Sequence, residues 1–458
     1  MVSPFIILAA GLGAAFFLGM TGSRYKKFTA AVVVLVMAIF NLVSIQWFIQ
    51  YVPGSQTGMA VFTAGFKPPF AISLGIGRQE AFISMLVNLL GLMSSLVMWK
   101  KMSGDSQKLG SVLLVLFMGL NILILTRDLF NMFVFLEITA ISLAGLTLLD
   151  KSPKAHSAGF KYLLASGLIS SLYLLGVVLA YFNTGSLFLD DLKMYDWLSV
   201  PMGTAVIFLI LISIVLELKP FPANGWALDL YQGAHPSIGA IVSGGIATTM
   251  LFVLHKLMLI ASPAMYQVLV VSGLTTFLFS NWMGMAQSNP QRLLGYSSTE
   301  QIGLIIAVLG LQPILGEHTL IIAAGILTKH FLAKSGLFWL AGIVKGETLE
   351  SWAVLRNKNI LLILFGIFIF ALSGFPPCPS FFAKWDLMMG LAENHQYIWI
   401  VAILAGSMFE AVYLFRWLGM AVKSPLNENE TQFSVPWNKL FPPALFGILL
   451  LGAGYWSI

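Results

Sequence analysis

Long runs of apolar residues recur along the sequence and leave few folds open to it. Examples are residues 5–20, 163–182, 361–372 and 444–455, and none of these runs alternates with a period of two. A helix needs about 20 mostly apolar residues to cross a bilayer, and lipid admits only helices or closed barrels. Only 10% of the residues are charged, whereas a soluble domain carries roughly 25%. We therefore predict an all-α polytopic membrane protein.

Fourteen segments are apolar enough to be transmembrane helices. Two of them, 201–233 and 359–392, are too long for one ordinary helix, and both contain proline and glycine in the middle. No basic region precedes the first segment, so we expect a retained helix there and not a cleaved signal peptide. The predicted spans are 4–20, 28–49, 79–99, 109–126, 129–149, 160–182, 201–233, 237–260, 265–286, 297–311, 319–343, 359–392, 397–419 and 440–457.

The basic residues predict how the chain is oriented. If the N-terminus lies outside, fifteen of the 25 lysines and arginines, from Arg24 to Lys439, fall at cytoplasmic helix ends. Only four fall at outer ends, which is the bias of the positive-inside rule and predicts that both termini lie outside. The four are Lys67, Arg78, Arg127 and Lys193. Six fit neither group and are candidates for burial at membrane depth: Lys219, Lys256, Lys329, Lys334, Lys384 and Arg416.

Each of the two long segments is interrupted beside a lysine. The first break, LELKPFPANGW at 216–226, contains Lys219, and the second, SGFPPCP at 373–379, is followed by Lys384. Proline ends a helix, and the backbone groups that it frees are tolerated in lipid only where protein or water satisfies them. Paired breaks in two halves of a chain indicate a transport site built on inverted repeats, here of five helices each. The alternative, two proline kinks with snorkelling lysines, is disfavoured because the breaks and the lysines match.

A carboxylate lies in the middle of the apolar segment 129–149. This residue, Glu137, costs about 2.5–3.5 kcal/mol to insert as a charged group. We expect it to pair with a cation, for which Lys219 is the natural partner, or to remain protonated. The alternative is a structural hydrogen bond to a hydroxyl group.

The segment 319–343 carries three basic residues. His330 and Lys334 are four residues apart and share one face of a helix. Lys329 points away from that face, and contact with a neighbouring subunit or a loop is an equal alternative for it. A buried lysine releases its proton more readily than an exposed one, and a neighbouring carboxylate reverses that tendency. We therefore predict a proton path that runs through Glu137, Lys219, His330, Lys334 and Lys384.

Other ionisable residues have simpler explanations. Glu300 lies near the start of its predicted helix, where it can act as a cap, and Glu410 lies near the middle of 397–419. Arg416 is close enough to the cytoplasmic end of its helix to snorkel. We expect His255 and Lys256 to lie at the outer membrane interface.

The segments around these residues are similar to a known family. They are 127–137 (RDLFNMFVFLE), 219–236 (starting KPFP), 296–303 (YSSTEQIG), 330–342, and 373–377 (SGFPP) with Lys384. The chain resembles the antiporter-like subunits shared by respiratory complex I (its subunits L, M and N), Mrp-type cation/proton antiporters (their D-type subunit) and energy-converting membrane-bound hydrogenases with their sulfur-reducing relatives. The resemblance extends from residue 127 to 384, and the count of fourteen helices agrees with it.

The resemblance implies a role for each residue of the predicted path. Glu137 corresponds to the essential glutamate of the fifth helix, and Lys219 to the lysine of the broken seventh helix. His330 and Lys334 correspond to the basic pair of the eleventh helix. Lys384 corresponds to the terminal lysine of the broken twelfth helix.

The sequence departs from this family in the eighth helix, where several relatives carry a lysine. Only Thr248 lies near that place, so hydroxyl groups and water would have to connect Lys219 with the eleventh helix. The chain ends soon after its last helix, which favours the D or N type of subunit. The resemblance divides the chain into helices 1–3 (1–108), a first repeat of helices 4–8 (109–262), a second repeat of helices 9–13 (263–422) and helix 14 (423–458).

We therefore expect an ion-translocating subunit, for protons or sodium ions, in a multisubunit complex of the cell inner or plasma membrane. Its partners would be other membrane subunits and lipid, and not nucleic acid. The single cysteine, Cys378, excludes an intramolecular disulfide and a cysteine-based metal or iron–sulfur site in this chain. We expect neither a cofactor nor a metal here, and redox chemistry, if any, in partner subunits. The alternatives are a non-pumping structural subunit and an independent secondary transporter.

Overall fold

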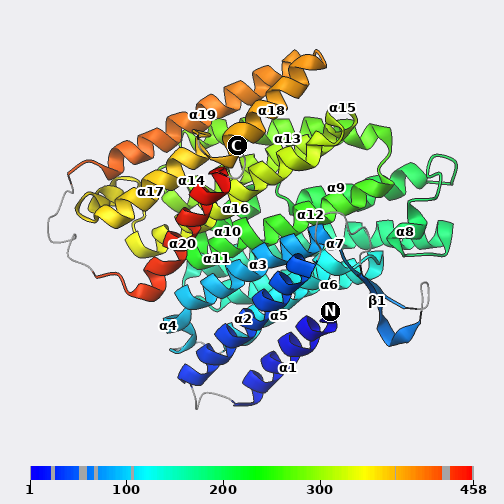
Figure 1. Cartoon of the computed structure of the whole chain (residues 1–458), viewed down its shortest axis with the longest axis horizontal. Coiled ribbons are helices and arrows are strands. Elements are labelled where there is room, and N and C mark those ends of the chain that lie inside the picture. Colours follow the sequence, from blue (N-terminus) through cyan, green and yellow to red (C-terminus); the bar gives the residue numbers. More distant parts are fainter. Residues whose placement is uncertain are drawn as a thin grey trace. The chain divides into compact units, whose positions relative to one another are not determined.

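The computed structural model describes residues 2–21, 26–50, 59–66, 71–104, 108–376, 378–424 and 434–455. Arg24 and Lys67, which were used to predict the orientation, and Pro377 of the second break lie outside these ranges. The described part of the chain is helical apart from one short hairpin (Figure 1). The chain divides into two compact units, unit 1 (Met1–Glu217 and Thr248–Ser262) and unit 2 (Leu218–Ala247 and Pro263–Ile458).

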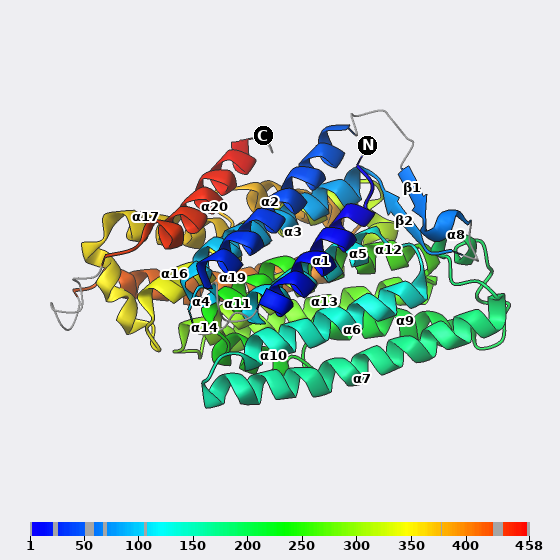
Figure 2. The same ribbon diagram turned by 90° about the horizontal axis from the view of Figure 1, so that it is seen from below.

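Unit 1 contains the hairpin and most of the first half of the chain. Its helices α6, α7 and α9 pack together in sequence, and Figure 2 shows α6 and α7 running side by side. Strand β1 (Met59–Phe62) pairs antiparallel with β2 (Ser73–Ile76) between two predicted spans. The helices are α1 (Phe5–Thr21), α2 (Lys26–Gln50), η2 (Thr63–Gly65), α3 (Arg78–Val97), α4 (Trp99–Met102), α5 (Lys108–Leu125), α6 (Leu129–Leu148), α7 (Pro153–Thr184), α8 (Leu189–Leu192), α9 (Gly203–Glu217), α12 (Ala247–Leu257) and η4 (Met258–Ile260).

Unit 2 is organised around one helix, α14. Every residue from Leu293 to Gly310 of α14 is buried, and α14 packs against α10, α13 and α16. The helices of unit 2 are α10 (Gly225–Gly233), α11 (Pro236–Ala240), η3 (Ile241–Ile246), α13 (Pro263–Gly284), α14 (Pro290–Gly310), α15 (Gln312–Leu315), α16 (His318–Val344), η5 (Glu350–Asn357), α17 (Asn359–Leu372), α18 (Pro379–Glu393), α19 (Tyr397–Ala421) and α20 (Trp437–Tyr455).

Glycines allow α13 and α14 to approach closely. A Cβ atom on Gly273 would lie 2.5 Å from the carbonyl oxygen of Gly303, and a Cβ atom on Gly303 would lie 2.7 Å from the carbonyl oxygen of Gly273. Small residues at such contacts let membrane helices pack through their backbones. This contact holds α14, with its polar side chains, against α13.

The predicted membrane spans fall on helices. Within the described residues, ten helices are long and apolar enough to cross a membrane. Four shorter apolar helices coincide with the remaining predicted spans, at Phe5–Met20, Gly203–Glu217, Asn359–Leu372 and Trp437–Ala453. The mainly helical membrane architecture is therefore confirmed, while the count of fourteen crossings and the inverted repeats remain predictions.

Two helices begin earlier than predicted, because their first turns are polar. Helix α7 begins at Pro153 after the N-cap Ser152, and α14 begins at Pro290 after the N-cap Asn289. A capping side chain followed by proline is a strong signal for a helix start. The prediction followed only the apolar residues and missed this signal. As a result, Glu300 lies in the middle of α14, and its predicted role as a cap is wrong.

Both predicted breaks are confirmed. Helix α9 ends at Glu217 and α10 begins at Gly225, whereas α17 ends at Leu372 and α18 begins at Pro379. Lys219 has a φ of 62° and Gly374 has a φ of 79°, which is the left-handed conformation that ends a helix. Left-handed backbone is costly for a lysine and occurs mostly where the surrounding structure imposes it.

Candidate functional site

The first break places Lys219 inside unit 2. Its side chain is buried, and its Nζ lies 5.6 Å from the centre of the Tyr231 ring. Among the described residues, Lys219 Nζ has no hydrogen-bond partner. Tyr231, on α10, stacks on Phe338 of α16 at 5.4 Å. The ammonium group is therefore stabilised by an aromatic face, and its hydrogen-bonding capacity stays open to water or a mobile ion.

A short chain of hydroxyl groups leads from Tyr231 to the eleventh predicted helix. The Tyr231 hydroxyl lies 3.1 Å from Ser298 Oγ, which lies 2.8 Å from Ser243 Oγ. Nε2 of His330, on α16, lies 2.9 Å from the backbone oxygen of Ser243. Ser243 belongs to the π-helical turn η3, and such turns often mark functional sites. The hydroxyl chain therefore ends at Ser243, and His330 contacts this residue through its backbone carbonyl and not through its hydroxyl.

Helix α16 directs Lys329, His330 and Lys334 to different partners. Lys334 Nζ donates to Ser297 Oγ of α14, while Lys329 Nζ donates to the carbonyl oxygen of Leu372 at 3.4 Å. His330, Lys334 and Lys329 are all fully buried. Lys329 therefore contacts the end of α17 at the second break and, being fully buried in this chain, does not face a neighbouring subunit.

The second break is followed by a buried ion pair. Lys384 Nζ, on α18, lies 3.1 Å from Oε2 of Glu410 on α19 and also donates to Ser407 Oγ at 3.2 Å. The amide of Gln301, on α14, donates to Oε1 of Glu410 at 2.9 Å. Glu410 is fully buried and has a partner on each carboxylate oxygen. It is a functional candidate that the predicted path did not include.

A second carboxylate from α14 lies in the same region. Glu300 is fully buried, and Asn281 Nδ2 donates to its Oε2 at 3.3 Å. The Tyr413 hydroxyl donates to Asn281 Oδ1 at 3.0 Å. Glu300 also interacts electrostatically with Lys334 and Glu410. The polar run 296–301, inside an otherwise apolar segment, was the feature of the sequence that could have indicated Glu300 as a functional residue.

Glu137, in contrast, belongs to unit 1. It lies on α6 and is half-buried. Elsewhere in unit 1, Tyr162 of α7 donates to Oε1 of Glu217 at 3.4 Å. Thr248 is fully buried, and its hydroxyl has no hydrogen-bond partner in the described part of the chain. Because Lys219 is in unit 2, the pairing of Glu137 with Lys219 remains a prediction.

Like Lys329, two further residues of the six unassigned basic residues bind the ends of helices. Lys256 Nζ donates to the carbonyl oxygens of Leu123, Ile124 and Thr126, at 3.0, 2.9 and 2.7 Å. Arg416 donates to the carbonyl oxygens of Met285 and Gln287, both at 2.6 Å. These carbonyls lie at the ends of α5 and α13, and helix C-termini leave such groups unpaired. Lys256 is buried against the end of α5, and its position at the level of the outer membrane interface remains a prediction.

The start of α6 carries its own charged groups, outside the predicted spans. Arg127 Nε donates to Asp190 Oδ2 at 2.9 Å. Burial opposes the charge of Arg127, but Asp190 and Glu80 outweigh it, so the pKa of Arg127 is raised. Asp128 caps α6 by accepting from the Asn131 N–H at 2.7 Å. Burial raises the pKa of Asp128, and the hydrogen bonds from the Asn131 and Phe130 backbones reduce this effect.

The site in unit 2 thus joins side chains from α10, η3, α14, α16, α18 and α19. Four of its residues belong to the path predicted from the sequence: Lys219, His330, Lys334 and Lys384. The site also contains Glu300, Glu410 and the connecting hydroxyl and amide groups, which that predicted path did not include. Among the described residues, no three His, Cys, Asp or Glu side chains gather into a metal-binding group. The arrangement suits transfer of protons or small cations between buried groups.

The chain matches a known membrane family over more than half of its length. The model of that family, described as NADH:quinone oxidoreductase/Mrp antiporter, TM, matches residues 126–410. One relative, NADH-quinone oxidoreductase subunit N of Desulforudis audaxviator, is 28% identical over 376 residues, which cover 78% of this chain and 74% of the relative. Another, the D-type subunit of the Na(+)/H(+) antiporter of Alkalihalophilus pseudofirmus, is 25% identical over 405 residues, which cover 85% of this chain and 81% of the relative.

A solved structure extends the similarity to the whole fold. A chain of the membrane-bound sulfane sulfur reductase, an archaeal respiratory membrane complex, superposes with a TM-score of 0.91 at 25% identity. The match covers 99% of this chain and 94% of the other. The chain therefore belongs to the NADH:quinone oxidoreductase/Mrp antiporter family of multi-pass membrane proteins.

Proposed function

We propose that the chain, as a member of this family, translocates protons or sodium ions in a multisubunit membrane complex. The relatives are named as subunits of an NADH-quinone oxidoreductase and of a Na(+)/H(+) antiporter, and the similar structure is a respiratory membrane complex. By analogy, neighbouring subunits supply either redox chemistry or a sodium gradient. The path itself consists of Glu137, Lys219, His330, Lys334 and Lys384, and we add Glu300 and Glu410 to it.

The buried pair of Lys384 and Glu410 is the observation that carries this proposal. A charge within a membrane helix is costly and is usually retained for function. Here the pair is held by Gln301 and Ser407, so both partners keep a fixed position. A proton that reaches Glu410 neutralises the carboxylate and weakens its hold on Lys384. The ammonium group can then pass its proton to water beyond the break.

The remaining groups of unit 2 form a route toward that pair. Lys219 and the hydroxyls of Tyr231, Ser298 and Ser243 lead to His330 and Lys334 on α16. Lys334 continues through Ser297 to α14, which carries Glu300 and Gln301. Hydroxyl groups both donate and accept, so they can relay protons. Water would have to complete the route at both ends, because Lys219 lies over the face of the Tyr231 ring and His330 contacts the carbonyl oxygen of Ser243. Several atoms along this route, such as His330 Nδ1 and Glu300 Oε1, are buried without a partner in the described residues, and ordered water satisfies groups of this kind.

A non-pumping structural subunit is the competing function, and one observation favours it. The resemblance implies a lysine near the position of Thr248 in several relatives, and the Thr248 hydroxyl is buried without a partner in the described residues. A structural subunit, however, has no need for the buried pair of Lys384 and Glu410. The insertion cost of two charges argues for ion transfer.

Proton uptake by the reconstituted complex tests the proposal. The intact complex would be purified through a tag on this chain, placed in vesicles and energised by its own electron donor or by a sodium gradient. We expect Glu410→Gln to reduce proton uptake by at least tenfold while subunit composition is unchanged. Glu393→Gln, which alters an exposed glutamate of α18, serves as the matched control. Normal uptake by the Glu410→Gln complex would support the structural role.

Two further substitutions test the first half of the path. We expect Glu137→Gln to abolish uptake while the complex still assembles. Lys219→Ala should lower uptake strongly, and Lys219→Arg should be milder because the charge is kept. Equal uptake by wild type, Lys219→Ala and Lys219→Arg would rule out a role for Lys219 in ion transfer.

A further inference from the structure

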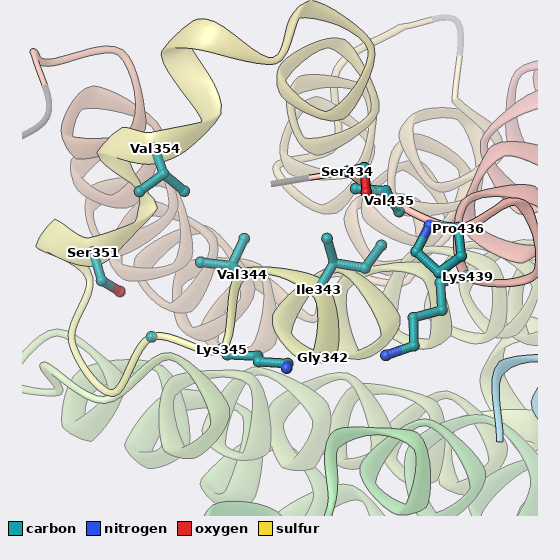
Figure 3. Close-up of a pocket in the computed structure, with 11 residues that line it drawn as sticks. Gly342, Ile343, Val344, Lys345, Ser351, Val354, Ser434, Val435, Pro436 and Lys439 are labelled. Atoms are coloured by element: carbon teal, nitrogen blue, oxygen red, sulfur yellow. The ribbon is translucent and has the colours of Figure 1, made fainter. Parts of the chain in front are cut away.

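A pocket in unit 2 lies apart from the candidate ion path. It has a volume of about 500 Å³ and lies where α16 ends, next to η5 and the start of α20 (Figure 3). Its wall combines apolar side chains, such as Val354 and Val435, with the hydroxyl-bearing residues Ser351 and Ser434. The described lining includes two lysines, Lys345 and Lys439, and no acidic residue.

The two lysines converge on the pocket. Lys345 follows the last turn of α16 with a φ of 57°, and its backbone N–H donates to the carbonyl oxygen of Ala341. Lys439 lies in the first turn of α20. In Figure 3 the ammonium groups of these lysines point toward one another across the pocket. Two ammonium groups that converge in this way can both donate to one anion.

The two helix ends that line the pocket have opposite effects on a bound anion. The start of α20, a helix of 19 residues, directs the positive end of its dipole toward the pocket. The end of α16 also lines the pocket and contributes the negative end of a dipole. Among the described lining residues, the only charged side chains are those of the two lysines. Lysine ammonium groups and helix starts both bind phosphate groups well.

The level of the pocket in the membrane indicates a lipid. Helix α16 is one of the candidate membrane spans, and α20 is one of the shorter apolar helices. If both helices cross the membrane as the sequence predicts, a pocket at the end of one and the start of the other lies at headgroup level. Trp437, at the start of α20, is 71% exposed and packs on Phe441 at 5.4 Å. Tryptophan in this position is typical of the membrane–water interface.

We propose that this pocket binds the phosphate group of an anionic phospholipid through Lys345 and Lys439. The apolar side chains of Ile343, Val354 and Val435 would contact the glycerol and the first part of the acyl chains. Basic pockets between membrane helices recognise anionic headgroups in this way. The proposal does not depend on the ion path, since none of the path residues lines the pocket.

Native mass spectrometry of the full-length chain, freed of co-purified lipid, tests the proposal. The chain is titrated with phosphatidylglycerol, which is anionic, and separately with phosphatidylcholine, which carries a phosphate but no net charge. We expect tighter binding of phosphatidylglycerol to the wild type. The double substitution Lys345→Gln and Lys439→Gln should weaken this binding by about 30-fold, since each lysine near a lipid surface contributes roughly fivefold.

Matched variants separate loss of binding from loss of fold. Lys151→Gln with Lys423→Gln removes two exposed lysines away from the pocket and should bind lipid as the wild type does. Lys345→Arg with Lys439→Arg keeps both charges and should retain most of the binding. If the glutamine variant does not fold, the proposal is still tested in two ways. The first is the comparison of phosphatidylglycerol with phosphatidylcholine binding by the wild type, and the second is the binding of phosphatidylglycerol by the arginine variant.

Three results would overturn the proposal. The first is equal binding of phosphatidylglycerol by a monodisperse glutamine variant and the wild type. The second is equal binding of phosphatidylcholine and phosphatidylglycerol by the wild type. The third is displacement of phosphatidylglycerol by millimolar inorganic phosphate, because the pocket would then bind a soluble phosphate compound and not a lipid.

Discussion

Five basic residues of this chain donate to partners of two chemical kinds. Lys256, Lys329 and Arg416 donate to backbone carbonyl oxygens at the ends of helices. Lys334 and Lys384 instead donate to the side chains of serine or glutamate. A carbonyl partner cannot take up a proton, whereas a carboxylate can and a hydroxyl can relay one. We therefore infer that Lys256, Lys329 and Arg416 complete helix ends, whereas the partners of Lys334 and Lys384 can take part in ion transfer.

Lys256 provides a test of the structural kind. Lys256→Met leaves three buried carbonyl oxygens at the end of α5 without a donor. An unsatisfied buried polar group costs about 1–3 kcal/mol, so we expect a clear fall in the apparent Tm of the purified chain. Lys27→Met, at an exposed position of α2, is the control. An unchanged Tm for Lys256→Met would show that these hydrogen bonds contribute nothing to stability.

Helix ends in this chain are decided by capping groups as much as by hydrophobicity. Asp128 caps α6, Ser152 caps α7 and Asn289 caps α14. Proline then follows the cap in α7 and α14. In both of those helices the first turn is polar, so the apolar pattern alone placed their starts about seven residues too late.

The Asp128 cap makes a specific contribution to the pH dependence of stability. Because the pKa of Asp128 is raised in the folded chain, the folded state holds this proton more firmly than the unfolded state. The stabilisation that protonated Asp128 gives the folded chain is therefore fully present below the pKa of aspartate in the unfolded chain, about 3.9. It is lost as pH rises through the higher pKa of Asp128 in the folded chain. Asp128→Asn keeps an oxygen that can accept from the Asn131 N–H but removes the titration.

Measuring the Tm of wild type and Asp128→Asn between pH 3 and pH 7 checks this prediction. We expect the Tm of Asp128→Asn to rise relative to the Tm of the wild type as pH rises. Asp196→Asn alters an exposed aspartate of the same unit and serves as the control. Parallel curves for wild type and Asp128→Asn would contradict the expected linkage.

The contact between α13 and α14 provides a test at the level of helix packing. Gly303→Ala would place a Cβ atom 2.7 Å from the Gly273 carbonyl oxygen and 2.9 Å from the Phe277 nitrogen. Both are backbone atoms, so the helices must move apart, and overpacking of this kind costs about 1–3 kcal/mol. We expect a lower Tm and weaker ion transport, since α14 carries Glu300 and Gln301.

Gly167→Ala is the matched control for this substitution. Gly167 is exposed on α7, and a Cβ atom there would meet nothing within 4 Å. If Gly303→Ala and Gly167→Ala have the same Tm, the close approach of α13 and α14 does not limit stability.

At the scale of the whole molecule, the positions of the basic residues predict topology. Cysteines introduced singly into a chain in which Cys378 is replaced by serine would report it, since the chain has no other cysteine. We expect a membrane-impermeant maleimide to label Lys151→Cys only from the cytoplasmic side and Lys193→Cys only from the outside. Labelling of both from one side would contradict the predicted topology.

The sequence by itself determined the class of fold, the two broken helices and four of the buried polar residues in unit 2. These follow from local rules: apolar length predicts a membrane helix, proline ends it, and a lysine far from any helix end must be buried. The departure at Thr248 was also visible in the sequence, because it is a matter of residue type.

The tertiary structure alone decided which polar groups meet. Nothing in the local pattern shows that Lys384 pairs with Glu410, 26 residues away, or that Ser298 connects Tyr231 with Ser243. Lys256 and Lys384 look alike in the sequence, yet one binds carbonyls and the other a carboxylate. The cause is physical: a buried polar side chain takes its role from its hydrogen-bond partners, and helix packing brings those partners from distant segments.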